Sequence, residues 1–133
     1  MSEKEIKQMY SSADYRGLTE KERRIFQSVV RDNSDLLKPA DAPMLASYAR
    51  NVSLARKAAE EIEQNGVMVD VVDKYHGTRR VENPAVGILQ KSQAAYEATG
   101  IKLGITPTGR KRLKGEGAPK KTALQQFNDE CDD

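Results

Sequence analysis

The stretch that decides the fold is VENPAVGILQ, Val81–Gln90, where an extended segment gives way to a helix. Asn83 is a strong N-cap residue, and Pro84 suits the first helical position because its missing N–H would have no partner there. Apolar residues follow at helical spacing, at Ile88, Leu89, Ala95, Tyr96 and Leu103. The pattern predicts a helix over about residues 84–103, which Gly104 ends.

A valine-rich stretch precedes this helix. VMVDVVDKYHGTRRV, Val67–Val81, is rich in β-branched residues and contains KYHG, which can turn the chain. It predicts a β-hairpin at about 67–82, with strands over 67–72 and 78–82. His76 falls in the turn, where a residue tolerating an unusual backbone angle is expected. An isolated hairpin is marginally stable in water, so this one should pack on the long helix, on a neighbouring subunit, or on both.

Two more helices are expected upstream of the hairpin. LTEKERRIFQSVV opens with a capping box, Thr19 and Glu22, which predicts a helix over about residues 19–31. Asp41 is the expected N-cap of a longer helix over about 41–64, which Asn65 and Gly66 end. One apolar face, rich in alanine, runs along this helix: Leu45, Tyr48, Ala49, Val52, Ala55, Ala59 and Ile62.

The two ends of the chain have weaker patterns. Residues 1–17 are polar with scattered apolar side chains and predict a flexible arm. LGITPTGRKRL repeats the cap and proline at Thr106 and Pro107, which predicts a short helix over about 107–113. Residues 115–133 are expected to be disordered, first basic and then acidic.

These elements predict a mainly α-helical fold with one hairpin, in a single domain over residues 18–114. Hydrophobic residues make up 38% of the 133-residue chain, charged residues 32%, and tryptophan is absent. Such a chain buries a thin core, so we expect it to gain stability by assembling with copies of itself. The candidate interface residues are Val67, Val69 and Val71 of the hairpin, with Ala55 and Ala59 of the alanine-rich face.

Charge is distributed unevenly along the chain. The formal net charge is +2, yet Lys102–Lys121 carries seven basic residues and one acid, Glu116. Thr122–Asp133 carries four acids and no base. A basic arm followed by an acidic tail suggests contact with a polyanion and with a separate basic surface. A solvated, disordered C-terminal segment is the alternative.

Nucleic acid is the polyanion that we expect. Lysine and arginine neutralise phosphates and release counterions, which gives salt-dependent and mostly sequence-blind affinity. The candidate contacts are Arg110, Lys111, Arg112 and Lys114, with Lys120 and Lys121 as flexible helpers. Other cations lie on the first two long helices, at Arg23, Arg24, Arg31, Arg50, Arg56 and Lys57. Those helices could form a helix-turn-helix-like unit, although their loop is long for that motif. For Arg56 and Lys57, pairing with nearby acids is favoured.

Residues suited to catalysis are scarce. His76 is the only histidine and Cys131 the only cysteine, and no Cys/His metal cluster is possible. The acidic run Glu60–Glu63 reads as a solvated helix face, and no glycine-rich phosphate loop occurs. We therefore expect no enzymatic activity, no metal and no cofactor. The N-terminal stretch lacks the apolar run of a signal peptide, and no stretch has the roughly 20 apolar residues of a membrane span. We expect a soluble protein of a reducing cytoplasm.

The order of these pieces resembles a known family. A capped helix beginning LT-x-x-E, a long helix, a valine hairpin, and NPAVGILQKSQAAYEATGIKLGITPTGRKRL are similar to the small subunit of tailed-phage terminases. The resemblance covers about residues 18–114. Its most specific part is an N-P helix closing on L-G-[LI]-T-P-x-x-R-x-R-L, matched here by Asn83, Pro84, Leu89, Leu103, Gly104, Ile105, Thr106, Pro107, Arg110, Arg112 and Leu113. The hairpin turn DKYHGTR is bulkier than the family's Gly-rich turn.

The resemblance implies a non-enzymatic component of phage DNA packaging in the host cytoplasm. Family members form closed rings from their helices and hairpins, and recognise viral double-stranded DNA at its packaging start. They hand it to the terminase large subunit, which holds the ATPase and nuclease activities that the small subunit modulates. The basic residues are then contacts for DNA or for the large subunit.

Other function classes remain as alternatives. A helix-turn-helix transcription regulator would be a dimer bound to symmetric half-sites about one helical turn apart. A scaffold protein would not bind DNA, and an enzyme would hydrolyse DNA or ATP without a partner. Assembly size, a salt titration of DNA binding and activity of the purified chain distinguish these classes from the ring.

Overall fold

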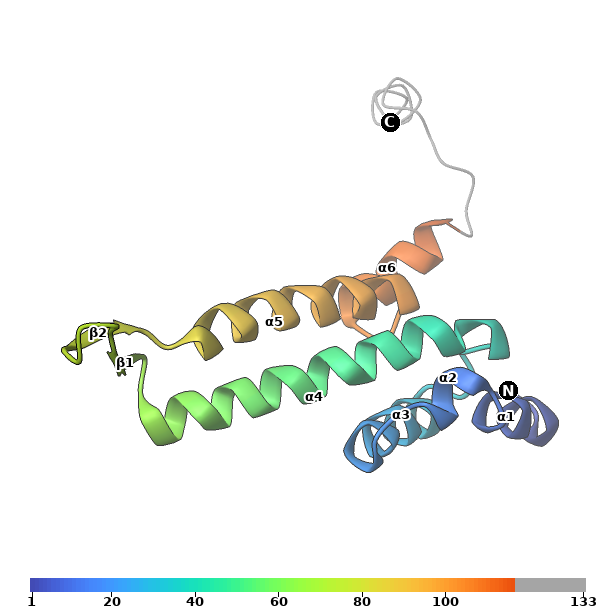
Figure 1. The fold of residues 1–133 in the computed structure, drawn as a ribbon. Coiled ribbons are helices and arrows are strands. Elements are labelled where there is room, and N and C mark those ends of the chain that lie inside the picture. The colour runs from blue at the N-terminus through green and yellow to red at the C-terminus, as the bar shows by residue number, and fades with distance from the viewer. Residues whose placement is uncertain (117–133) are drawn as a thin grey trace, which may run out of the picture.

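The computed structural model describes residues 1–116, without the side chains of residues 112 and 114–116. Its elements are, in chain order, α1 (Glu3–Tyr10), α2 (Ala13–Arg16), α3 (Glu20–Asp32), the 3-10 helix η1 (Pro39–Asp41), α4 (Ala42–Asn65), β1 (Met68–Val72), β2 (Thr78–Glu82), α5 (Pro84–Leu103) and α6 (Pro107–Glu116) (Figure 1). The predicted mainly helical fold with one hairpin is confirmed. The predicted tail lies outside the described residues from residue 117 on, and residues 115 and 116 end α6.

The two longest helices, α4 and α5, pack against each other and run in opposite directions (Figure 1). α4 has 24 residues, so it is about 36 Å long at 1.5 Å per residue. Small residues are buried on both helices, including Ala55 and Ala58 on α4 and Ser92 and Gly100 on α5. Because small side chains let two backbones approach closely, these positions hold the pair together without large apolar side chains.

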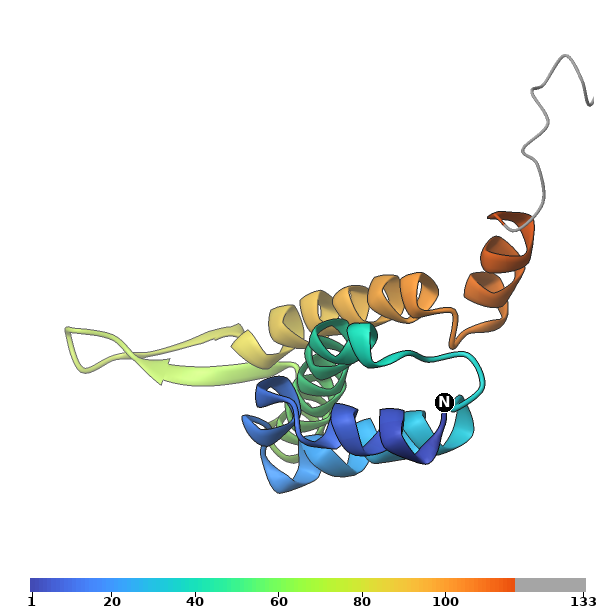
Figure 2. The same cartoon turned by 90° about the vertical axis from the view of Figure 1, so that its right-hand side faces the viewer.

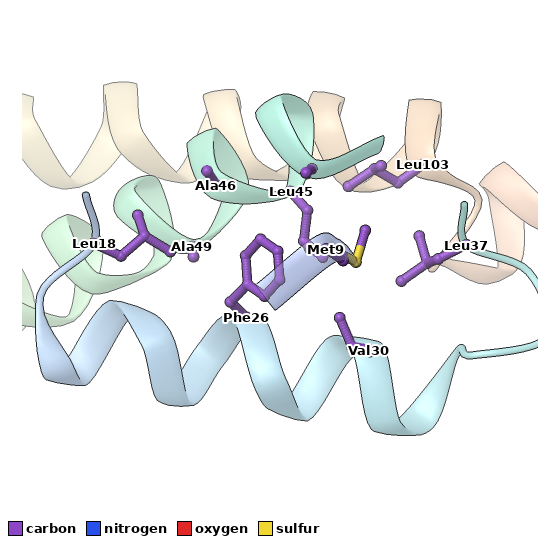
Figure 3. Packing of buried hydrophobic residues seen from close by; sticks show 10 residues of the cluster. Met9, Leu18, Phe26, Val30, Leu37, Leu45, Ala46, Ala49 and Leu103 are labelled. Atoms are coloured by element: carbon purple, nitrogen blue, oxygen red, sulfur yellow. The ribbon is translucent and has the colours of Figure 1, made fainter. Parts of the chain in front are cut away.

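The largest buried side chains gather around the first half of α4, where α1, α3 and the end of α5 meet it (Figure 3). Phe26 and Val30 of α3 and Leu45 of α4 are at most 2% exposed. The remaining members of this cluster are Met9, Leu18, Leu37, Ala42, Ala46, Ala49 and Leu103. The hydrophobic core therefore lies at one end of the molecule, away from the hairpin.

Residues 1–17 differ from the flexible arm expected from the sequence, because they form α1 and α2 against this core. Met9 is completely buried, and the Tyr15 ring lies 5.0 Å from the Phe26 ring and 4.9 Å from the Tyr10 ring, between centroids. The serine N-caps Ser2 and Ser12 accept hydrogen bonds at the starts of α1 and α2. The segment contains few apolar residues, but Met1, Met9, Tyr10 and Tyr15 all belong to the core or pack against it.

The starts of α3 and α4 differ in how well the sequence predicts them. The Thr19 and Glu22 capping box of α3 is confirmed, with the Thr19 N–H donating to Glu22 Oε1 at 2.9 Å. Asp41 lies before α4 as predicted, but its side chain makes no cap bond to that helix. Instead, Asp41 Oδ2 accepts a hydrogen bond of 2.9 Å from the Lys38 N–H and closes η1.

The hairpin extends beyond the ends of α4 and α5 (Figures 1 and 2). Its register pairs Val69 with Val81 and Val71 with Arg79. Val69 and Val71 are two residues apart on β1, so they lie on the same face of the hairpin. Asp73 holds the turn, because its Oδ1 accepts from the N–H groups of Tyr75 and Gly77 at 2.9 and 3.0 Å. His76 has φ of 64°, which confirms the predicted unusual turn angle.

Asn83 joins the hairpin to both long helices. Its side chain accepts from the Ala85 N–H at 3.0 Å, which confirms the predicted N-cap of α5. Its amide also donates to the Gly66 carbonyl at 2.9 Å, and its backbone N–H donates to the Val67 carbonyl at 2.7 Å. Gly66 has φ of 86°, which favours glycine at the end of α4. Asn83 is 3% exposed, so these bonds are shielded from water.

Gly104 and Gly109 place α6 close to the end of α5. Gly104 ends α5 in the left-handed conformation, with φ of 76°. A Cβ added at Gly109 would collide with the Ile101 carbonyl and lie 2.9 Å from the Gly104 Cα. Thr106 caps α6, since its Oγ1 accepts from the Gly109 N–H at 3.0 Å. Only glycine at position 109 allows this contact of backbone with backbone.

Replacing Asn83 by alanine should lower the free energy of unfolding by about 1–2 kcal/mol, because the α5 cap and the bond to Gly66 are both lost. Urea denaturation at one fixed protein concentration measures the change. Asn51→Ala is the matched control, because Asn51 is only partly buried and bonds to the Ser47 carbonyl within α4. Equal stability of Asn83→Ala and Asn51→Ala would contradict the proposed role of this junction.

Replacing Gly109 by alanine should destabilise the packing of α6 on α5 by about 1–3 kcal/mol, because backbone atoms block the new methyl group. Gly87→Ala is the control, since Gly87 lies within α5 with no atom within 4 Å of an added Cβ. That control should be neutral or stabilising by up to about 1 kcal/mol. Hydrogen exchange of the α6 amides should accelerate in Gly109→Ala only. Unchanged exchange there would show that α6 packs differently.

Candidate nucleic-acid interface

The predicted basic contacts belong to α6, which begins directly after α5. Arg110 and Lys111 are exposed on it. Arg110 Nη1 donates a long hydrogen bond of 3.4 Å to the Ile105 carbonyl. The backbone N–H of Arg110 donates to the Thr106 carbonyl at 2.9 Å. Arg112 and Lys114 also belong to α6, but their side chains lie outside the described part of the chain. Lys120 and Lys121 lie wholly outside it.

The cations of α3 and α4 do not form a helix-turn-helix. Residues 33–41, which include η1, separate α3 from α4, whereas that motif has a turn of about 3–4 residues. Some of the cations serve the fold itself. Arg23 Nη2 donates to the Arg16 carbonyl at 2.7 Å, and its guanidinium lies 5.5 Å from the Tyr15 ring centroid. Arg24 pairs with Glu20 at 2.7 Å on the surface.

A groove between α3 and α4 was not predicted from the sequence. It encloses about 530 Å³. We define its floor as the buried or half-buried apolar residues with Tyr48, and its sides as the exposed cations of both helices. The lining residues are Lys21, Arg24, Ile25, Ser28, Val29, Tyr48, Val52, Ser53, Arg56, Lys57 and Glu60. The i, i+4 pairs Ile25 with Val29 and Tyr48 with Val52 are visible in the sequence. The sequence does not show that α3 and α4 are neighbours in space. The groove between them is therefore seen only in the structure.

The electrostatics of this groove combine burial and positive charge. Burial raises the pKa of the Tyr48 phenol, neighbouring Tyr96 raises it further, and Arg56 acts in the opposite direction. The Tyr48 and Tyr96 rings meet edge to face at 5.9 Å. Among the described residues, the ion pairs are Arg24–Glu20 and Arg31–Asp32. The expected pairing of Arg56 and Lys57 with nearby acids is therefore not seen.

The residues predicted for contacts between subunits occupy different environments. Val67 is 56% exposed, and Val69 and Val71 are half-buried on one hairpin face. Ala59 is exposed on α4. Ala55 departs from the prediction, because it is only 6% exposed and is already buried within the single chain. The hairpin also exposes Met68 and Val72, which sequence reasoning did not single out.

Residues 1–116 contain neither a candidate metal site nor a membrane span. No group of three or more His, Cys, Asp or Glu side chains there could hold a metal ion. Within the same residues, every helix is too short or too polar to cross a membrane.

Comparison with known proteins gives one positive result. The family model described as phage terminase, small subunit, matches residues 22–120. No curated protein gives a significant match to the chain, and neither does any solved structure. The family match covers α3 to α6 and extends past the described residues. Since it spans well over half of the chain, the protein belongs to the phage terminase small subunit family and acts in phage DNA packaging.

Proposed function

We propose that this small subunit binds viral double-stranded DNA at the packaging start and regulates the ATPase and nuclease of the terminase large subunit, without being an enzyme itself. It does so as a homo-oligomeric ring in the host cytoplasm. Membership of the family supports the pairing with DNA and with a large subunit. The observation that carries the DNA proposal is that α6 exposes Arg110 and Lys111 directly after the fixed end of α5.

The DNA contact that we propose is made with phosphates. Arg110, Lys111, Arg112 and Lys114 belong to one short helix, and Lys120 and Lys121 follow it in the sequence. Cations in such a run neutralise several phosphates without reading base edges, so they supply affinity and not sequence preference. The same side chains are alternative contacts for the large subunit. In a ring each basic helix is repeated, so weak single contacts combine through effective concentration.

Assembly into a ring is supported by what the hairpin exposes. Val72 is 70% exposed, Val67 is 56% exposed and Met68 is 41% exposed. Hairpins are marginally stable alone, and this one extends past the helices (Figure 2). A neighbouring subunit that covers Val67, Val69 and Val71 would bury the apolar surface of one hairpin face, whereas Met68 and Val72 lie on the other face. Exposed Ala59 lies on the preceding helix. Ala55 offers little surface to this interface, because it is only 6% exposed within the single chain.

Replacing Arg110, Lys111 and Arg112 together by alanine should weaken DNA binding at low salt and reduce the slope of log K against log salt by up to about three units. Fluorescence anisotropy with a duplex, titrated over a salt series, measures both quantities. The control replaces the exposed cations Lys4, Lys7 and Lys91, which removes the same charge from α1 and α5 and leaves α6 unchanged. An unchanged slope in the α6 variant would place the DNA surface elsewhere. Binding by neither variant nor the parent chain would favour a scaffold protein.

Native mass spectrometry should show an assembly of three or more copies of the 14.8 kDa chain. Val67→Asp combined with Val69→Asp should shift it towards monomers, because both side chains lie on the hairpin face proposed to be covered and two charges would then enter the buried contact. The control adds the same charge on α1 and just after it, as Gln8→Asp with Ser11→Asp, where both residues are exposed. A stable dimer in the parent chain would contradict the proposed ring.

A further inference from the structure

The groove between α3 and α4 combines two chemistries that its own chain does not explain. Its floor contains Ile25 and Val29 from α3 and Tyr48 and Val52 from α4, all buried or half-buried. Lys21 and Arg24 stand on the α3 side, and Arg56 and Lys57 stand on the α4 side. Glu60 is the acid in the lining, and of the four cations only Arg24 is in an ion pair among the described residues. The sides are therefore positive while the floor is apolar.

This combination fits an acidic amphipathic peptide better than a nucleic acid. A duplex presents charged phosphates to a basic surface and has few apolar groups that could cover Ile25, Val29 and Val52. A peptide with apolar side chains next to carboxylates would satisfy floor and sides together. Helix-lined grooves recognise peptides in this way, with apolar anchors in the groove and charges at its rim.

A segment of this chain has that composition. Thr122–Asp133, TALQQFNDECDD, carries Asp129, Glu130, Asp132 and Asp133 and no basic residue. Leu124 and Phe127 come shortly before the acids. We propose that the α3–α4 groove is the docking site of this acidic C-terminal segment of the same polypeptide.

The length of the chain allows this contact. Leu124 comes eight residues after Glu116, the end of α6, and Asp129 comes thirteen residues after it. At about 3.4 Å per extended residue these stretches span up to roughly 27 Å and 44 Å. The second distance exceeds the length of α4, along which the groove lies. Because the segment is tethered, its effective concentration at the groove is high, so exposed ion pairs that are weak singly can hold it. The proposal does not depend on DNA binding.

Cys131 provides the test, since it is the only cysteine and lies among the acids. A nitroxide spin label on Cys131 of the full chain should broaden the methyl resonances of Ile25, Val29 and Val52. The methyl groups of Val72 and Val81 in the hairpin should stay sharp. Salt should abolish the broadening, since the Debye length falls from about 10 Å at 0.1 M to about 3 Å at 1 M. A diamagnetic label on Cys131 supplies the reference spectrum.

Two independent variants should abolish the broadening. One is Lys21→Ser with Arg56→Ser and Lys57→Ser, which removes cations from the groove. The other is Asp129→Asn with Glu130→Gln, Asp132→Asn and Asp133→Asn, which leaves the described fold untouched. The matched control, Lys4→Ser with Lys7→Ser and Lys91→Ser, should keep it. Groove methyl groups that stay sharp in the labelled parent chain would overturn the proposal. So would persistence of the broadening in both variants.

Two other results would assign the groove to another occupant. Isotope-labelled chain carrying Cys131→Ser, refolded together with spin-labelled chain, should show no broadening. Broadening there would place the segment on a neighbouring subunit and overturn docking within one chain. If duplex DNA shifts the groove methyl resonances while the label on Cys131 leaves them sharp, the groove binds nucleic acid and the proposal fails.

Discussion

The buried side chain of Asn83 connects three parts of the molecule that no large apolar core reaches. Its amide donates to Gly66 at the end of α4, its oxygen caps α5 at Ala85, and its backbone N–H continues the strand pairing to Val67. An unsatisfied amide at 3% exposure would be costly, so all these bonds must form together. The antiparallel order of α4 and α5, and the direction in which the hairpin leaves them, both depend on this arrangement.

The rest of the stabilisation lies at the opposite end. Phe26, Leu45 and Met9 are completely buried there, and α1 and α2 are part of that core. The buried positions in the middle of the α4–α5 pair are mostly alanine, serine and glycine, which bury little apolar area per residue. The chain thus has one well-packed end, a close-packed middle with small side chains, and a hairpin with exposed valines. This distribution supports the proposal that a copy of the chain covers the hairpin.

Local signals in the sequence predicted most of the fold, because caps, glycines and β-branched runs act over a few residues. Asn83 with Pro84, the Thr19 capping box and His76 in the turn are of this kind. The N-terminal helices were missed because Met9 and Tyr15 form no periodic apolar pattern in the sequence. Their packing with Phe26 in the core explains why α1 and α2 are ordered. Asp41 was predicted as a cap by residue type, but its position after Pro39 lets it close η1 instead. The basic run of α6 was visible from composition alone. The α3–α4 groove was not, because it depends on which helices become neighbours.

If the proposed ring forms, the geometry at Gly66 and Asn83 would affect how many copies it contains. When one surface of a chain binds a different surface of the next, each joint rotates the assembly by a fixed angle, and the circle closes only if that angle divides a full turn. The orientation of the hairpin relative to α4 and α5 would contribute to that angle. This orientation depends in turn on the backbone of Gly66, which has φ of 86°. A small change in the backbone angles at Gly66 would thus change the circumference of the ring. It could also leave an open helical filament in place of a closed ring.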